Sequence, residues 1–263
     1  MLLLSGGGTA TDLWHAADQD PPNVYDTIGA QTRVCSWDRP GVQYLDGSPS
    51  RSTPVAQPAT PQDGADDLQA MLDALDMQGP YVLAAHSFAG NIARVFAAEH
   101  PADVKGIVFV DVLSPELRAQ MTPDEWRMWV AGNNRTPEQV ASYPDMEQYD
   151  FNASLDQVEA ADPLGPMPVV VLTASVKFAE LVPEYIDEGL VPSDVPRDFG
   201  VTIDRTNTAA QTELAGYFPG SVQITDTDAG HNIMIDNAPV VIQAIEDVLA
   251  AVRAGRTTLT SGG

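Results

Sequence analysis

The chain has 263 residues, 44% of them hydrophobic, a size and composition that fit one domain with a sizeable core and exclude global disorder. Its 37 acidic and 13 basic side chains give a formal net charge of −24, so nucleic acid and anionic membranes, which would be repelled, are not expected partners. No apolar run reaches the roughly 20 residues of a membrane-spanning helix, and the first residues lack the basic stretch of a signal peptide.

Charge and cysteine usage also bear on location. Cys35 is the single cysteine, so an intrachain disulfide is impossible, and its apolar surroundings favour a core position. Nothing in these features indicates export, so the cytoplasm is the expected location. The acidity fits either an adaptation to high salt, which screens self-repulsion, or an ordinary acidic protein.

Short apolar runs alternate with helical patterns along the chain. Thr60 and Pro61 predict a helix start, and Gly79-Pro80 ends that helix. Further helices are predicted over 88–100, 206–217 and 240–252, and irregular backbone over 184–196. The predicted strands are 2–4, 33–37, 82–87, 104–110, 168–173 and 221–225. Such alternation predicts an α/β fold, a mostly parallel sheet with helices on both faces.

The pattern changes between Ser114 and Pro166, where aromatic residues mix with acids and prolines in helical pieces. We interpret 114–166 as a helical cap inserted into a core formed by 1–113 and 167–255, with a flexible tail over 256–263. Trp126 and Trp129 are candidates for lining a substrate pocket beneath the cap, although packing on the core explains them equally well.

The predicted strand over 82–87 meets the next helix through a very tight turn with Ser87 at its apex. Ala85 and Ala89 lie two residues either side of the serine, where only small side chains fit such a turn. Alanine stands at both positions where the motif for a nucleophilic serine usually has glycine. The side chains are still small enough for the turn, but the strict motif is not matched. We expect His86 to point away from the serine.

Four features fall at predicted strand ends, where parallel sheets gather functional groups: the 6–8 glycine loop, Ser87, Asp111 and His231. An amide of the glycine loop, best placed at Gly7, could form half of an oxyanion hole.

These motifs, in this order, resemble the α/β-hydrolase superfamily, in its branch of small capped esterase-like enzymes, over nearly the whole chain. The matching segments are 3–7, 36–41, 85–90, 108–111 and 228–231. The resemblance implies that Ser87 is a nucleophile and His231 its base, with the amides of Phe88 and Gly7 holding an oxyanion.

Three departures accompany the resemblance. The oxyanion loop begins with Ser5-Gly6 instead of His-Gly. The one or two strands that usually precede this loop are missing, so we expect either a sheet shortened at its N-terminal edge or a sequence that lacks its start. The usual acid position after the strand over 168–173 carries Lys177. Some superfamily members take the acid from the strand after the nucleophile helix, which points to Asp111. Glu180 and Glu184 remain alternatives.

The expected function is hydrolysis of a small or medium uncharged ester or lactone through an acyl-enzyme, with no cofactor and a small molecule as the partner. A non-catalytic binding protein, or an amide, peptide or C–C bond hydrolase on the same fold, remains an alternative. No metal-ligand spacing is present. Asp38 and Arg39 are interpreted as a pair that locks a turn.

Overall fold

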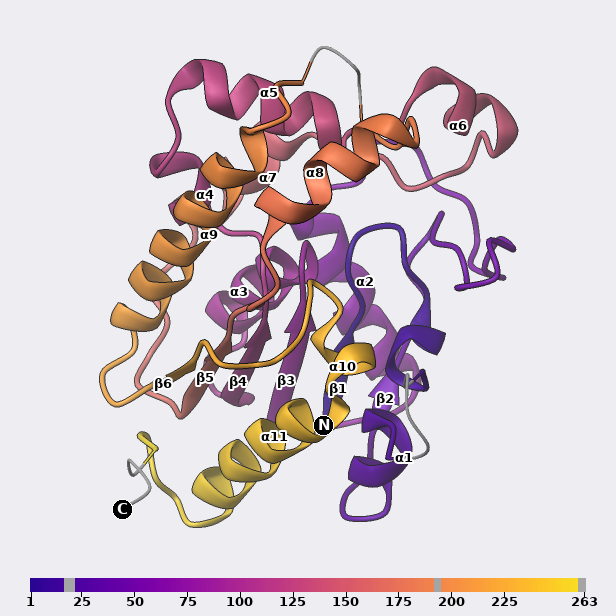
Figure 1. Cartoon of the computed structure of the whole chain (residues 1–263). Coiled ribbons are helices and arrows are strands. Elements are labelled where there is room, and N and C mark those ends of the chain that lie inside the picture. Colours follow the sequence, from indigo (N-terminus) through magenta and orange to yellow (C-terminus); the bar gives the residue numbers. More distant parts are fainter. Residues whose placement is uncertain (17–21, 192–194, 260–263) are drawn as a thin grey trace.

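A parallel sheet, six strands among the described residues, forms the centre of the protein (Figure 1). The computed structural model describes residues 1–16, 22–191 and 195–259. The strand order is β2-β1-β3-β4-β5-β6, which leaves β2 and β6 as open edges. The strands are β1 (Leu2–Leu4), β2 (Cys35–Ser36), β3 (Tyr81–His86), β4 (Val104–Val110), β5 (Val169–Leu172) and β6 (Val222–Ile224). This architecture confirms the predicted fold class.

The central strands are mostly apolar and buried because helices cover both faces of the sheet. Neighbouring residues of β1, β3, β4 and β5 enter two separate cores, as the twofold period of a strand requires. Leu83 and Phe109 face the core formed with α2 (Pro61–Ala74) and α3 (Ala89–Glu99). The opposite face packs against α1 (Val24–Gly29) and α11 (Ala238–Arg253), whose apolar stripe includes Val241, Ile245 and Val248.

The start of α2 confirms the predicted N-cap. The Thr60 side chain accepts a hydrogen bond from the Asp63 amide, and the Asp63 carboxylate accepts one from the Thr60 amide. Pro61 occupies the first helical position, where a missing N–H costs nothing.

Helices lie above the carboxyl ends of the strands (Figure 1). Between β4 and β5 the chain forms α4 (Pro115–Ala119), α5 (Pro123–Asn133), α6 (Pro137–Ser142) and α7 (Phe151–Ala160). After β5 it forms α8 (Phe178–Asp187) and α9 (Phe199–Gly216), and α8 lies beside the first group. The cover therefore comes from two segments. We call the first, residues 115–160, the cap, and α8 belongs to the second.

The prediction of irregular backbone from Glu184 was wrong for 184–187, which belong to α8. Residues 192–194 of that segment lie outside the described residues, as do 260–263 of the expected tail. Helix α8 contains an internal proline, Pro183, and at its start Asp204 of α9 accepts hydrogen bonds from the amides of Phe178 and Ala179. Two amides at the helix start thus gain a partner distant in sequence.

Shorter elements complete the described chain. A 3-10 turn spans Thr11–Trp14, and α10 (Ile233–Asp236) precedes α11. Within 1–16, 22–191 and 195–259, no helix combines the length and apolar character needed to cross a membrane.

Candidate active site

Ser87 sits in a strained turn between β3 and α3. Its φ is 53°, in the left-handed region that costs a residue other than glycine roughly 1–3 kcal/mol. The turn is held by hydrogen bonds from the Ser87 amide to the Val110 carbonyl (3.2 Å) and from the Leu113 amide to the Ser87 carbonyl (3.0 Å). Ala85 and Ala89 are fully buried on either side. This packing fixes the backbone of Ser87 at the carboxyl end of β3.

The glycine loop lies directly beside this turn because β1 pairs with β3. A Cβ on Gly6 would lie 3.1 Å from Ser87 Cβ, and one on Gly7 would lie 2.7 Å from the Tyr149 hydroxyl, so the close approach requires glycine. Within the described chain, the amides of Gly7 and Phe88 donate no hydrogen bond. Both donors are therefore available to a ligand.

His231 and Asp111 are directly hydrogen-bonded: His231 Nδ1 lies 2.7 Å from Asp111 Oδ2. Asp111 follows β4, and its side chain is 3% exposed. Its other oxygen accepts hydrogen bonds from the Ala174 amide (3.1 Å) and from Asn207 Nδ2 (3.0 Å).

Opposing effects set the charge of Asp111. Burial alone would raise the pKa of this carboxyl, but the hydrogen bond and charge of His231, helped by the Ala174 and Asn207 donors, hold the pKa below its usual range. Asp111 is therefore an ionised acceptor at neutral pH. His231 Nδ1 carries the shared proton, and Nε2 is left as the basic nitrogen.

The alternative acids lie elsewhere. Glu180 and Glu184 are exposed on α8, and among the described contacts neither bonds to His231. Lys177, which occupies the usual acid position, is the residue before α8. The structure thus brings Asp111, and neither glutamate, to the imidazole.

A cavity of about 450 Å³ joins these groups beneath the cap. Ser87 and His231 both line it, although no hydrogen bond links their side chains among the described contacts. Its lining is Gly7, Ser87, Phe88, Asp111, Val112, Leu113, Leu117, Trp129, Asn133, Arg135, Tyr149, Phe151, Phe178, Tyr185, Ile203, Asn207, His231 and Asn232. The cavity combines reactive polar groups with an apolar wall.

Only one of the two predicted pocket tryptophans reaches this cavity. Trp129 lines it, whereas Trp126 does not. Trp126 stacks against Trp129 at 5.0 Å between ring centroids, and its Nε1 donates to Asn152 Oδ1 at 2.8 Å. Trp126 thus supports the wall from behind because its indole N–H has a partner inside the cap.

Arg39 has a different role from the predicted turn lock. Its guanidinium donates to the carbonyls of Ser5 (2.6 Å) and Gly6 (2.7 Å) and forms an ion pair with Glu147 at 2.8 Å. Glu147 also accepts from the Gly8 amide at 2.5 Å. The pair is buried and ties the glycine loop to the segment between α6 and α7. The sequence pattern missed Glu147 because 108 residues separate the partners.

His86 lies under His231, away from the cavity lining. Its Nε2 is 3.0 Å from the His231 carbonyl oxygen, and the two rings are 4.6 Å apart. Burial, together with the charge of His231, lowers the pKa of His86 to about 3, so the ring is neutral at pH 7. Since a carbonyl only accepts, Nε2 carries the proton. His86 therefore anchors the loop that bears His231.

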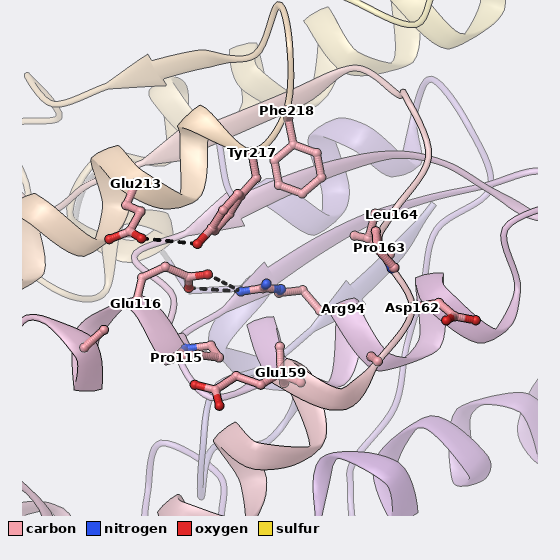
Figure 2. Close-up of a pocket in the computed structure, with 13 residues that line it drawn as sticks. Arg94, Pro115, Glu116, Glu159, Asp162, Pro163, Leu164, Glu213, Tyr217 and Phe218 are labelled. Carbon is pink, nitrogen blue, oxygen red and sulfur yellow. Dashed lines mark hydrogen bonds and ion pairs between the residues drawn. The ribbon is translucent and has the colours of Figure 1, made fainter.

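A second cavity, of about 460 Å³, lies between α3, α4, α7 and the end of α9 (Figure 2). In it, Arg94 Nη1 binds both carboxylate oxygens of Glu116, at 3.0 and 3.1 Å, and the Tyr217 hydroxyl lies 3.2 Å from Glu213. None of the predicted site residues lines this cavity. Its polar groups are therefore separate from those of the cavity that Ser87 lines.

No metal site accompanies these groups in the part of the chain that is described, where no cluster of three or more His, Cys, Asp or Glu side chains could hold an ion.

Comparison with known proteins places this architecture in a family. The alpha/beta hydrolase fold family matches residues 1–144, and the chain belongs to it. Membership in this family supports a hydrolase function. An uncharacterized protein of Schizosaccharomyces pombe is 46% identical over 86 residues, 32% of this chain and 14% of that protein. A probable transporter of Hormonema carpetanum, efuK, is 28% identical over 131 residues, 49% of this chain and 17% of that protein. The chain thus matches less than one fifth of either relative.

Solved structures share the fold at low sequence identity. An N-acyl homoserine lactone degrading enzyme, Est816, has a TM-score of 0.55 and 17% identity over 93% of this chain and 91% of its own. A thermophilic esterase from Thermogutta terrifontis has a TM-score of 0.54 and 20% identity, covering 95% and 89%. An enol-lactonase from Burkholderia xenovorans LB400 has a TM-score of 0.54 and 17% identity, covering 95% and 90%.

Proposed function

We propose that the protein is a serine hydrolase that cleaves small or medium esters or lactones through an acyl-enzyme. The observation that carries the proposal is the 2.7 Å hydrogen bond between His231 and Asp111, at the edge of a cavity that Ser87 also lines. The proposal is supported by two unused amides beside the serine, those of Gly7 and Phe88.

In the proposed reaction, Ser87 Oγ attacks the substrate carbonyl while His231 Nε2 takes its proton. Asp111 keeps the imidazole in the required tautomer and stabilises the imidazolium that forms. The serine and histidine side chains then meet in the substrate complex, because catalytic hydrogen bonds are often looser without substrate.

The negative oxygen of the tetrahedral intermediate would bind the amides of Gly7 and Phe88. One such donor is worth about 2.7–4 kcal/mol in the transition state. His231 then protonates the leaving alkoxide oxygen, the ester C–O bond breaks, and a water molecule repeats the cycle on the acyl-enzyme.

The cavity favours a substrate of limited size with an apolar part. Its wall includes Leu113, Leu117, Trp129, Phe151 and Ile203. An ester or lactone of modest size would bury its apolar atoms against this wall at roughly 25 cal/mol per Å².

Labelling with a fluorophosphonate tests the nucleophile. The wild-type protein should gain one adduct by intact mass, and Ser87→Ala should gain none. The parallel assay is hydrolysis of a panel of short and medium esters and lactones. If folded wild-type protein forms no adduct and cleaves no member of the panel, the protein is a binding protein and the proposal fails.

A further inference from the structure

One wall of the candidate catalytic cavity carries a positive charge. Arg135, in the loop between α5 and α6, lines this cavity together with Gly7, Ser87 and Tyr149. A Cβ placed on Gly8 would collide with the guanidinium of Arg135, so this side chain lies across the glycine loop. No other arginine or lysine lines the cavity among the described residues.

The guanidinium of Arg135 has only neutral partners. Nε donates to the Glu147 backbone carbonyl at 3.2 Å, and an Nη donates to the Tyr149 hydroxyl at 2.9 Å. Its other terminal nitrogen, Nη1, donates to no described residue, and Arg135 forms no ion pair with a described carboxylate. The nearby Glu147 carboxylate is already occupied by Arg39, the Gly8 amide and the Tyr149 hydroxyl.

Arg135 is one of several arginines for which the described residues show no carboxylate partner, and it is the one that lines the candidate catalytic cavity. Six other arginines form ion pairs: Arg39, Arg94, Arg118, Arg127, Arg197 and Arg205. With 37 acidic residues available, Arg135 faces a cavity with its charge uncompensated by a contact. A ligand could supply that contact.

Arg135 is held firmly enough to select a ligand. Its guanidinium carbon lies 5.3 Å from the centre of the Tyr149 ring. That ring is itself packed between Phe88 (5.0 Å) and Phe151 (5.2 Å), and its hydroxyl is fixed by Glu147. A guanidinium positioned in this way offers a planar set of donors, which matches a carboxylate.

We propose that Arg135 binds a carboxylate of the substrate, so that the preferred substrate is an ester or lactone whose acyl part ends in a carboxylate. This inference rests on the proposed function. It reverses the expectation of an uncharged substrate, which came from the net charge of the whole chain. A cation in direct contact with the substrate affects binding more than the net charge of the chain does. Salt screens the charges that lie beyond the Debye length, which is about 8 Å at physiological ionic strength.

The positions of Arg135 and of the two amides indicate which substrates would fit. The reacting carbonyl would lie at the amides of Gly7 and Phe88, and Arg135 crosses the same loop one residue further on. A half-ester of a short dicarboxylic acid places its two functional ends on these two neighbouring groups.

Monomethyl glutarate and dimethyl glutarate form a matched pair that tests this assignment. They have the same acyl chain and leaving group, and at pH 7.5 only the first carries a carboxylate. Proton release in a pH-stat gives kcat and KM for both. We expect wild-type kcat/KM to be at least tenfold higher for the half-ester.

Variants separate binding from a structural role. Arg135→Gln should lower kcat/KM at least 30-fold for the half-ester, mainly through KM, and about fivefold or less for the diester. Arg135→Lys should recover part of the preference because it keeps the charge. Arg127→Gln, which removes an exposed arginine of α5 that does not line the cavity, should leave both rates unchanged. Thermal melting of each variant checks folding.

The outcomes distinguish the two proposals. Equal losses for both substrates in Arg135→Gln, or a wild-type preference for the diester, would overturn the carboxylate site and leave the esterase proposal standing. Cleavage of other esters but of neither glutarate overturns the carboxylate site in the same way. An absence of all ester cleavage and of fluorophosphonate labelling overturns both.

Discussion

Arg39 and Glu147 form a buried ion pair that joins the glycine loop after β1 to the cap. Their side chains are only 5% and 4% exposed, and both are also hydrogen-bonded to the loop backbone. Burial would lower the pKa of Arg39, but the adjacent Glu147 carboxylate raises it, so the guanidinium stays charged. The cap therefore does more than cover the cavity: it holds the loop that carries Gly7.

Glu147→Gln should destabilise the protein and slow it. Loss of one partner leaves Arg39 buried without a counter-charge, at a cost of roughly 3–5 kcal/mol in the free energy of unfolding. The Gly8 amide also loses its charged acceptor, so kcat should fall tenfold or more while KM changes little. Urea unfolding and ester kinetics measure both effects. Glu138→Gln, an exposed glutamate of α6, is the matched control. If Glu147→Gln changed neither the free energy of unfolding nor kcat, the ion pair would not hold the glycine loop in its active position.

Asp111→Asn tests the acid. The amide keeps the size of the side chain, and asparagine tolerates the left-handed backbone found there, but it cannot stabilise an imidazolium. We expect kcat to fall by about 10⁴ with folding retained. Glu180→Gln and Glu184→Gln, which change exposed positions, should stay near the wild-type rate. A wild-type rate in Asp111→Asn together with loss in either glutamine variant would reassign the acid.

The lowered pKa of His86 predicts that the folded protein loses stability in mild acid. Its pKa is about 3 in the folded protein, lowered by burial, against roughly 6.5 when unfolded. The unfolded chain therefore binds a proton first as the pH falls. The stabilising contribution is fully present above pH 6.5 and is lost as the pH drops towards 3, amounting to about 2 kcal/mol lost by pH 5.

The measurement is the free energy of unfolding of wild type and His86→Gln between pH 4 and 8. Glutamine keeps a donor for the His231 carbonyl but does not titrate. Its stability curve should be flatter over this range, by the same 2 kcal/mol at pH 5. Parallel curves would show that His86 does not control the acid response.

The Arg94–Glu116 ion pair in the second cavity provides a test of how much a buried charge pair contributes to stability (Figure 2). Glu116 is 4% exposed, so Arg94→Met should leave a buried carboxylate unpaired and cost roughly 3–5 kcal/mol. The double variant Arg94→Met/Glu116→Leu replaces both charges with apolar groups and should recover at least half of that loss. The measurement is the free energy of unfolding of both variants in urea. A double variant that is less stable than the single variant would contradict the prediction.

Much of the fold follows from local sequence. The apolar run over 104–110 predicted β4 with its observed bounds, and Thr60-Pro61 predicted the start of α2. The meeting of Asp111 and His231 was predictable too, because parallel strands end at one edge of a sheet. These features depend on neighbouring residues or on topology alone.

Other features depend on how distant segments pack. Helix α8 gains its N-terminal acceptor from Asp204, some 26 residues later, which no local pattern reveals. Glu147 and Arg135 reach the glycine loop only because the cap folds over it. Trp126 and Trp129 lie three residues apart on one side of α5 and stack on each other, so which of them reaches the cavity depends on how the helix packs over it.

The backbone itself marks the functional edge of the sheet. Among the described residues, four other than glycine have a positive φ: Asp76, Ser87, Asp111 and Asp228. The last three follow the carboxyl ends of β3, β4 and β6, and two of them, Ser87 and Asp111, line the cavity, whereas Asp76 lies after α2. At roughly 1–3 kcal/mol each, this concentrated strain is a sizeable share of a typical stability of 5–15 kcal/mol. Glycine would relieve the strain at these turns, so the side chains of Ser87 and Asp111, which line the cavity, are kept there at a cost in stability.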